Sequence, residues 1–318
     1  MRLCSAIAIG VVASFLLLVA IIAVTPPMDD FHPDNPYWNG LSEAEQLLGA
    51  TVIDNLESTL GAYDPESTTL LIIGPSEPFT QSEAEAIGDL VFNGGKVVLM
   101  DEFGTANQLL EKLGLNIYLN GSRLIDPLYK EKSEELPKAE GIFGELVLNY
   151  ATVIEGEDFE TLASSSIYSY LDLNQNCVYD PREPAGPFPV AVKIRLGGGE
   201  LWVISDSSVF INSMLQYQGN QELLLSLSSE GRTILIDKSH WTPSFHAVIR
   251  NHVSNILYLL FTFEIRYTFL LGFLVIIAKV PLKCRPKPPS PVETVLKKHP
   301  DWDKRLLEKL NEEMENAR

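Results

Sequence analysis

Residues 69–101, TLLIIGPSEPFTQSEAEAIGDLVFNGGKVVLMD, contain the pattern that decides the fold. The apolar run Thr69–Ile73 ends in Gly-Pro, as a buried parallel strand does. The capping box Thr80–Glu83 opens a helix that stops before the Asn-Gly-Gly at 93–95. A second apolar run, Lys96–Met100, follows directly. The segment therefore predicts a strand–helix–strand unit of a parallel sheet.

Predicted strands and helices continue to alternate on both sides of this unit. Ser42–Glu45 is another capping box, with Ser42 as N-cap, and predicts a helix to about Leu60. Further helices are predicted over 106–113 and 220–227, and further strands over 116–119, 190–196, 201–205 and 233–236. Alternating strands and helices predict right-handed crossovers and an α/β fold with a doubly wound, mostly parallel sheet of the flavodoxin-like kind. Residues 120–187 fit this strand–helix alternation less well and predict an insertion of antiparallel strands.

The composition excludes some classes of function. The 318 residues include 42 Asp and Glu against 24 Lys and Arg, a formal net charge of −18. Such a surface repels phosphate backbones, so we expect no nucleic-acid partner. The three cysteines stand far apart, at positions 4, 177 and 284. They predict neither a disulfide framework nor a cysteine zinc site.

Two apolar segments resemble membrane spans. Residues 3–24 carry no charge and, at about 1.5 Å a residue, are long enough as a helix to cross a hydrocarbon core. This segment, within 1–25, predicts an uncleaved anchor; the alternative is a signal peptide. Residues 254–280 predict a second span, interrupted by Glu264 and Arg266. Arg266 can either reach the interface or meet a partner helix.

The flanking charges predict the topology and the tail. Basic residues follow the second span at once, so we expect both termini in the cytoplasm and residues 26–253 outside the cell membrane. Residues 281–318 predict a proline-rich spacer and then an amphipathic helix within 301–318. That helix, or Glu264 and Arg266, is predicted to bind other membrane proteins.

The clearest chemical pattern is a loop of the calcium-binding type at 172–183, DLNQNCVYDPRE. Oxygen-bearing side chains fall at loop positions 1, 3, 5, 9 and 12, and a main-chain carbonyl is available at position 7. The predicted ligands are Asp172, Asn174, Asn176, Val178, Asp180 and Glu183. Position 6, normally glycine, is Cys177, which must take a strained backbone. The alternative is an Asx-rich turn without an ion.

A second pattern places acidic residues directly after predicted strands. Asp101, Asp206 and Asp237 each follow an apolar run, and the carboxyl ends of parallel strands form the usual ligand crevice. Four polar residues nearby complete this candidate ligand site: Glu102, Ser208, Asn212 and His240. The competing interpretation is that these aspartates cap the turns or helices that follow them.

The sequence contains little evidence for a catalytic nucleophile. No Gly-x-Ser-x-Gly elbow occurs, and no cysteine lies in a setting that activates a nucleophile. We therefore predict no catalytic residue. Asn120-Gly121-Ser122 is a sequon, which makes Asn120 a candidate for glycosylation.

With these residues placed, the chain resembles a family of membrane-anchored, archaeal-type proteins of unknown function whose domain is similar to class I glutamine amidotransferases. The resemblance lies in Leu71–Pro75, Val97–Asp101, Ser205–Asn212 and Leu235–His240. It implies an amidotransferase-like fold without the nucleophilic cysteine, and partners in membrane or ATPase complexes.

Together these patterns predict a non-catalytic binding or scaffold protein whose insertion is stabilised by Ca²⁺. The alternative is a cell-surface hydrolase or transferase that uses the strand-end aspartates.

Overall fold

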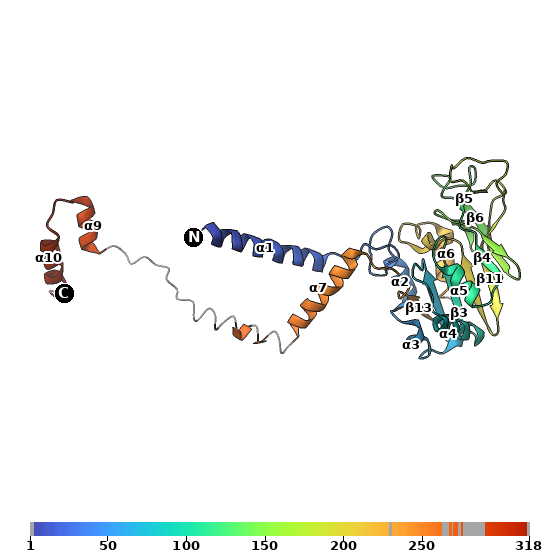
Figure 1. The fold of residues 1–318 in the computed structure, drawn as a ribbon, viewed down its shortest axis with the longest axis horizontal. Helices are drawn as coiled ribbons and strands as arrows, with labels where there is room; N and C mark the ends of the chain where they lie inside the picture. Colours follow the sequence, from blue (N-terminus) through green and yellow to red (C-terminus); the bar gives the residue numbers. More distant parts are fainter. Residues whose placement is uncertain are drawn as a thin grey trace. The chain divides into compact units, whose positions relative to one another are not determined.

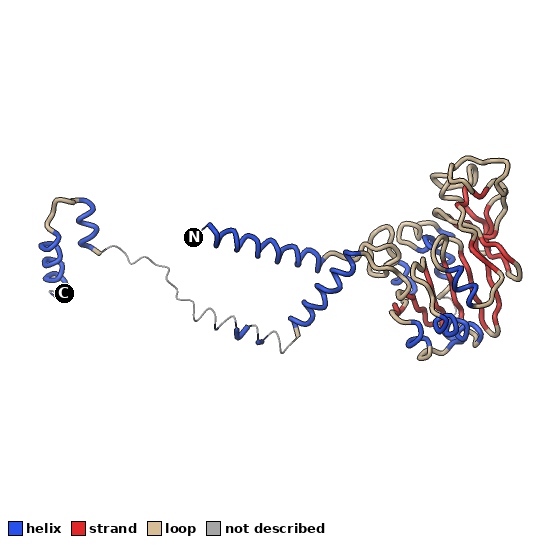
Figure 2. The backbone as a smooth tube through the Cα atoms, viewed as in Figure 1, coloured by secondary structure: helices blue, strands red, loops and turns tan. Residues whose placement is uncertain are grey.

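The computed structural model describes residues 3–228, 231–262, 267–268, 270–272, 275 and 290–316. The chain divides into two units, residues 1–255 and 256–318, and the first contains the α/β domain. Figure 1 labels its elements and Figure 2 separates helices from strands.

The described part of the first unit is built on a nine-stranded sheet with the order β1-β13-β2-β3-β12-β11-β9-β6-β7. Its strands are β1 (Thr51–Ile53), β2 (Thr68–Ile73), β3 (Lys96–Met100), β6 (Lys138–Gly141), β7 (Gly144–Val147), β9 (Glu160–Ser165), β11 (Pro189–Leu196), β12 (Gly199–Ile204) and β13 (Thr233–Asp237). The first five strands in this order run parallel, and the other four continue the sheet antiparallel. A mixed α/β domain with a large, mostly parallel central sheet is thus confirmed.

Helices cover both faces of this sheet because successive strand residues point to opposite sides. Leu71 and Ile73 of β2 join one apolar core with α2 (Ser42–Leu48) and α6 (Gln218–Ser226). Leu70 and Ile72 join the other core with the three remaining helices. Those helices are α3 (Leu56–Leu60), α4 (Gln81–Phe92) and α5 (Ala106–Lys112). Two buried faces explain why residues 70–73 of β2 and 97–100 of β3 are continuously apolar, instead of alternating.

The unit at 69–101 is predicted correctly, including its capping box. The Thr80 hydroxyl accepts a hydrogen bond from the Glu83 amide at 3.2 Å, and the Glu83 carboxylate accepts one from the Thr80 amide at 2.8 Å. The helix predicted from Ser42 to Leu60 is wrong. Gly49 adopts a left-handed conformation (φ 59°) that ends α2, and Thr51–Ile53 then pairs with β13 as the edge strand β1.

The insertion contains antiparallel strands, as predicted. Besides β6, β7 and β9, it holds β5 (Arg123–Ile125) paired with β10 (Tyr170–Asp172), and β8 (Ile154–Gly156). β8 pairs with β4 (Ile117–Leu119), a strand that the sequence predicts in the main sheet but that lies in this separate two-stranded sheet. Short 3₁₀ turns at Pro65–Ser67 (η1) and Ser207–Phe210 (η2) complete the regular structure.

Two helices flank the domain in sequence, α1 (Leu3–Val24) and α7 (Phe245–Phe261). In the described part of the chain, no helix combines the length and the apolar character that a membrane crossing needs. The predicted pair of transmembrane helices, and with it the two-pass topology with 26–253 outside, is therefore wrong.

Residues 263–266 of the second predicted span, with Glu264 and Arg266, and most of residues 269–280 lie outside the described residues, as does most of the predicted proline-rich spacer. In the second unit the described tail has two helices, α9 (Pro291–Lys298) and α10 (Lys304–Asn316). The amphipathic helix predicted within 301–318 is confirmed as α10. Its docking on other proteins stays a prediction.

Candidate functional site

A crevice of about 620 Å³ opens at the carboxyl ends of β1, β13 and β2. The three strand-end residues in its wall are Asp54, Lys238 and Gly74. The other walls are the segment 28–32, the loop 241–244 and the first turns of α7. Ligands of open α/β sheets bind at such strand ends, and the crevice is therefore the leading candidate site.

Aromatic side chains give the crevice an apolar wall. The Trp241 indole donates a hydrogen bond to the Ile73 carbonyl at 2.6 Å, which fixes the ring over the end of β2. The His32 ring lies 6.5 Å from it, centroid to centroid. Gly74 has φ 56°, and a β-carbon there would lie 2.8 Å from the Phe31 ring. Only glycine therefore lets this aromatic wall approach the sheet.

The charges in the crevice are mixed. The Lys238 ammonium lies 3.7 Å from the Asp54 carboxylate, and the Asp29 carboxylate accepts a hydrogen bond from the Ser244 amide at 3.2 Å. Burial, together with the nearby Lys238 charge, lowers the pKa of His32. The ring is therefore neutral at pH 7; its Nδ1 accepts a hydrogen bond from the Asp34 amide at 3.1 Å, which leaves the Nε2 hydrogen as its free donor.

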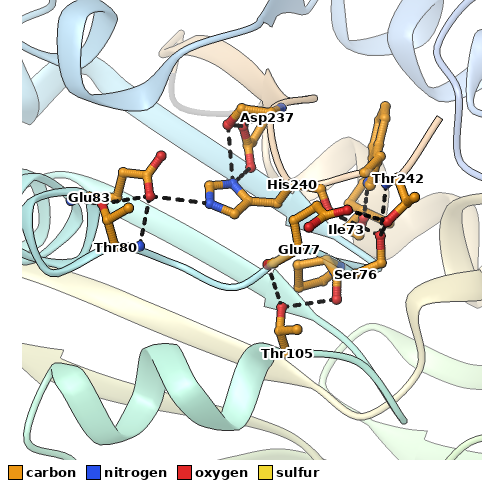
Figure 3. A network of polar contacts seen from close by, with 12 residues as sticks. Ile73, Ser76, Glu77, Thr80, Glu83, Thr105, Asp237, His240 and Thr242 are labelled. Carbon is orange, nitrogen blue, oxygen red and sulfur yellow. Dashed lines mark hydrogen bonds and ion pairs between the residues drawn. The ribbon is translucent and has the colours of Figure 1, made fainter. Parts of the chain in front are cut away.

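Asp237 and His240 form a separate, buried network beside the crevice (Figure 3). The His240 Nδ1 lies 2.7 Å from the Asp237 carboxylate, and its Nε2 lies 3.6 Å from the Glu83 carboxylate of α4. The Phe79 ring stacks on the imidazole at 3.9 Å. Burial disfavours protonation of His240, but the hydrogen bond to Asp237 and both carboxylate charges raise its pKa overall. This network joins the end of β13 to the start of α4.

Asp101 holds the turn that follows β3. Its carboxylate accepts hydrogen bonds from the amides of Glu102 and Gly104, both at 2.8 Å, and of Ala106, at 2.9 Å. Burial raises the pKa of Asp101, although these backbone donors oppose the shift. The competing interpretation made from the sequence, a capping aspartate, describes this residue well.

Asp206 and Glu102 stabilise the turn after β12. Asp206, fully buried, accepts hydrogen bonds from the amides of Ser208 at 2.7 Å and Asn149 at 2.6 Å. Glu102 accepts from the amide and hydroxyl of Ser207, at 2.8 and 2.6 Å. Burial and the charge of Glu102 raise the pKa of Asp206 well above its usual value. Burial also raises the pKa of Glu102.

Asn212 holds the segment that follows the crevice wall at 28–32. Its side-chain amide donates to the carbonyls of Asn35 at 3.1 Å and Tyr37 at 2.7 Å, and its oxygen accepts from the Glu43 amide at 3.0 Å. The seven strand-end residues predicted to form one ligand site thus belong to several separate hydrogen-bond networks and do not meet in one site. Because the pattern at 42–60 predicts one helix, the strand end at Asp54, and with it the crevice, is not predicted from the sequence.

The loop at 172–183 is compact and internally hydrogen-bonded. Asp172, 1% exposed, accepts from the amides of Asn176 and Cys177, both at 3.0 Å. Glu183, 6% exposed, accepts from the amides of Leu173 at 3.0 Å and Asp180 at 2.9 Å. Loop positions 1 and 12 therefore both face the loop backbone.

The remaining predicted ligands are also hydrogen-bonded to one another. The Asn174 and Asn176 amides donate to the Asp180 carboxylate at 2.6 and 3.4 Å, and the Val178 amide donates to Asn176. Cys177 has φ 57°, the strained backbone expected at position 6. Among the described residues, no group of three or more His, Cys, Asp or Glu side chains is arranged to hold a metal ion. The reason here is that Asp180 faces two amides instead of the other carboxylates.

Asn120, the glycosylation candidate, is half-buried. Its side-chain nitrogen donates to the Glu155 carboxylate at 2.6 Å, and its oxygen accepts from the Ser122 amide at 3.0 Å. A glycan on this nitrogen would have to displace the hydrogen bond to Glu155.

Comparisons with known proteins add a family but no activity. A family model described as "Domain of unknown function (DUF4350)" matches residues 33–228. No curated protein matches the chain.

Three solved structures are similar at a low level. The "mmIFT52 N-terminal domain" is 16% identical, with 55% of this chain and 79% of that one covered and a TM-score of 0.43. A β-galactosidase from Rahnella sp. R3 is 16% identical (60% and 26% covered, TM-score 0.38). A ThuA-like protein from Bacteroides uniformis ATCC 8492 is 15% identical (54% and 69% covered, TM-score 0.31). These scores are too low to carry an argument about function.

Proposed function

The chain belongs to the family described as a domain of unknown function (DUF4350), and we propose that its α/β domain is a non-catalytic binding domain whose ligand occupies the strand-end crevice. The crevice volume of about 620 Å³ lies within the range of about 300–1,000 Å³ typical of small-ligand sites. Its aromatic wall suits an apolar group, while Lys238, Asp54 and His32 offer hydrogen bonds that orient a polar one. We therefore expect a small ligand with both kinds of group.

The observation that carries this proposal is how the strand-end carboxylates are used. Asp101, Asp206 and Asp237 each accept hydrogen bonds from their own turns, in buried positions that a substrate does not reach. Catalytic acids and bases must instead meet the reacting group within hydrogen-bond distance. The alternative prediction, a hydrolase or transferase acting through these aspartates, gains no support from this geometry.

A blocking substitution tests the crevice. Asn251 is exposed on α7 and lines it, so Asn251→Trp should fill the cavity without disturbing the core. We expect compounds that raise the melting temperature of the wild-type chain in a small-molecule screen to lose their effect on this variant. His252→Trp, one residue along the same helix and outside the lining, is the matched control. Hits that bind the blocked variant equally well would contradict the proposal.

We also propose that the loop at 172–183 binds Ca²⁺. Three observations support this: the predicted ligands lie in one hydrogen-bonded cluster, Cys177 has the left-handed backbone of position 6, and Asp172 and Glu183 are buried carboxylates. Calcium prefers six to eight oxygen ligands, and this loop offers carboxylates, side-chain amides and a carbonyl. Binding would require Asp180 to turn from the amides of Asn174 and Asn176 toward the ion.

A calcium titration of the full chain, followed by heat and by calorimetry, tests the loop. At 100 times its dissociation constant, an ion that binds only the folded form should stabilise it by about 2.7 kcal/mol. Asp172→Asn and Glu183→Gln keep the side-chain shape and should abolish the effect, whereas Glu157→Ala, an exposed acid elsewhere in the insertion, should preserve it. No shift up to about 10 mM, beyond the extracellular range, would leave the loop an ion-free turn.

The finer resemblance to class I glutamine amidotransferases, an archaeal origin and a partner in an ATPase complex stay predictions. They fit a binding domain without a nucleophile, but the proposal above does not depend on them.

A further inference from the structure

The tail helix α10 carries an apolar stripe that stays exposed within the described part of its own unit. Leu306, Leu310 and Met314 recur every four residues and so share one face of the helix. They are 64, 49 and 67% exposed. Leu307 is only half-exposed, and Val292 of α9 is buried. The contact between α9 and α10 therefore leaves the stripe itself open.

The charges beside this stripe are self-complementary. Lys309 and Glu313 are four residues apart and border the stripe on the same side. When two such helices pair antiparallel about a two-fold axis near Asn311, Lys309 of each copy faces Glu313 of the other. A two-fold interface forms every contact twice, so both ion pairs are made at once. Parallel pairing would bring opposite flanks together and lose this match.

We propose that α10 pairs antiparallel with α10 of a second copy of this chain. Leu306 of one copy then packs against Met314 of the other, and Leu310 packs near the two-fold axis. The interface is small, and we expect a dissociation constant on the order of 10 µM, at the weak end for specific contacts. This inference is independent of the ligand crevice and of the calcium loop.

A charge-swap experiment on the full chain tests both the partner and the orientation. Donor- and acceptor-labelled copies are mixed and their energy transfer is titrated against concentration. Lys309→Glu and Glu313→Lys each create two like-charge contacts in the homodimer, and each should weaken self-association by about tenfold. An equimolar mixture of the two variants restores opposite charges at both contacts. That mixture should associate within about threefold of the wild-type chain.

Two variants on the opposite face of α10, Arg305→Glu and Glu312→Lys, make the same charge changes away from the stripe and should leave association unchanged. An ion pair within one helix would be lost in each single variant and not restored by mixing, so the mixture distinguishes the two explanations. The proposal is overturned if wild-type copies show no transfer at 200 µM, about twentyfold the expected constant. It is also overturned if the single variants associate normally, or if their mixture does not.

Discussion

The strand-end carboxylates and the carboxylates of the loop at 172–183 make the same kind of hydrogen bond but differ in how they are arranged along the chain. In both, aspartate and glutamate oxygens accept hydrogen bonds from backbone amides. The strand-end groups come from three separate strands, and each is occupied with its own turn. The loop groups come from twelve consecutive residues and form one cluster. Carboxylates scattered over a sheet edge thus stabilise the fold, whereas carboxylates spaced along one loop can also serve a ligand.

The strongest test of this difference is the loss of a strand-end carboxylate. Asp206→Ala leaves the amides of buried Ser208 and half-buried Asn149 without an acceptor. We expect it to lower the free energy of unfolding by about 3 kcal/mol, measured by denaturant titration. Asp180→Ala, in the partly exposed loop and without calcium, should cost less than about 1 kcal/mol. Equal costs would remove the distinction between the two regions.

The two histidines near the crevice should show opposite pH dependence. The pKa of His240 is raised above its reference of 6.5, so its protonated form stabilises the fold. That stabilisation is complete below the unfolded pKa and is lost as the pH rises through the folded pKa. The pKa of His32 is lowered, so its stabilisation is present above pH 6.5 and is lost as the pH falls.

Denaturant unfolding between pH 5.5 and 8.5 separates the contributions of His240 and His32 to the free energy of unfolding. His240→Gln should remove the loss of stability at rising pH, and it should also cost about 2 kcal/mol near neutral pH through lost hydrogen bonds. His32→Gln should remove only the loss at falling pH. A His240 variant whose pH profile matches the wild-type profile would show that its network does not titrate.

The smallest expected effect is a gain in stability. Cys177 has φ 57°, which glycine adopts without a side-chain penalty. Cys177→Gly should therefore stabilise the loop by up to about 1 kcal/mol and strengthen calcium binding. Val178→Gly, at the neighbouring position, is the control and should stabilise nothing. A destabilised Cys177→Gly variant would mean that the cysteine side chain contributes more than the backbone strain costs.

Local sequence signals were reliable where one segment contains all the interacting residues. The capping box at Thr80 and the apolar strands around it appear as predicted. The failures arose where distant contacts override local signals. Ser42 is the first residue of α2 instead of its cap, and its hydroxyl lies 3.2 Å from Asn212, a partner that no local pattern reveals.

The α/β class, the strand–helix–strand unit at 69–101 and the antiparallel insertion could be predicted from the sequence alone. Each depends on residues a few positions apart, whose geometry the chain fixes locally. The tertiary structure alone decided which strand ends meet. By inserting β13 between β1 and β2, it placed Asp54, Lys238 and Gly74 around one crevice and left Asp101 and Asp206 to their own turns. Strand order depends on long-range pairing between residues far apart in the chain, and spacing along the chain does not encode it.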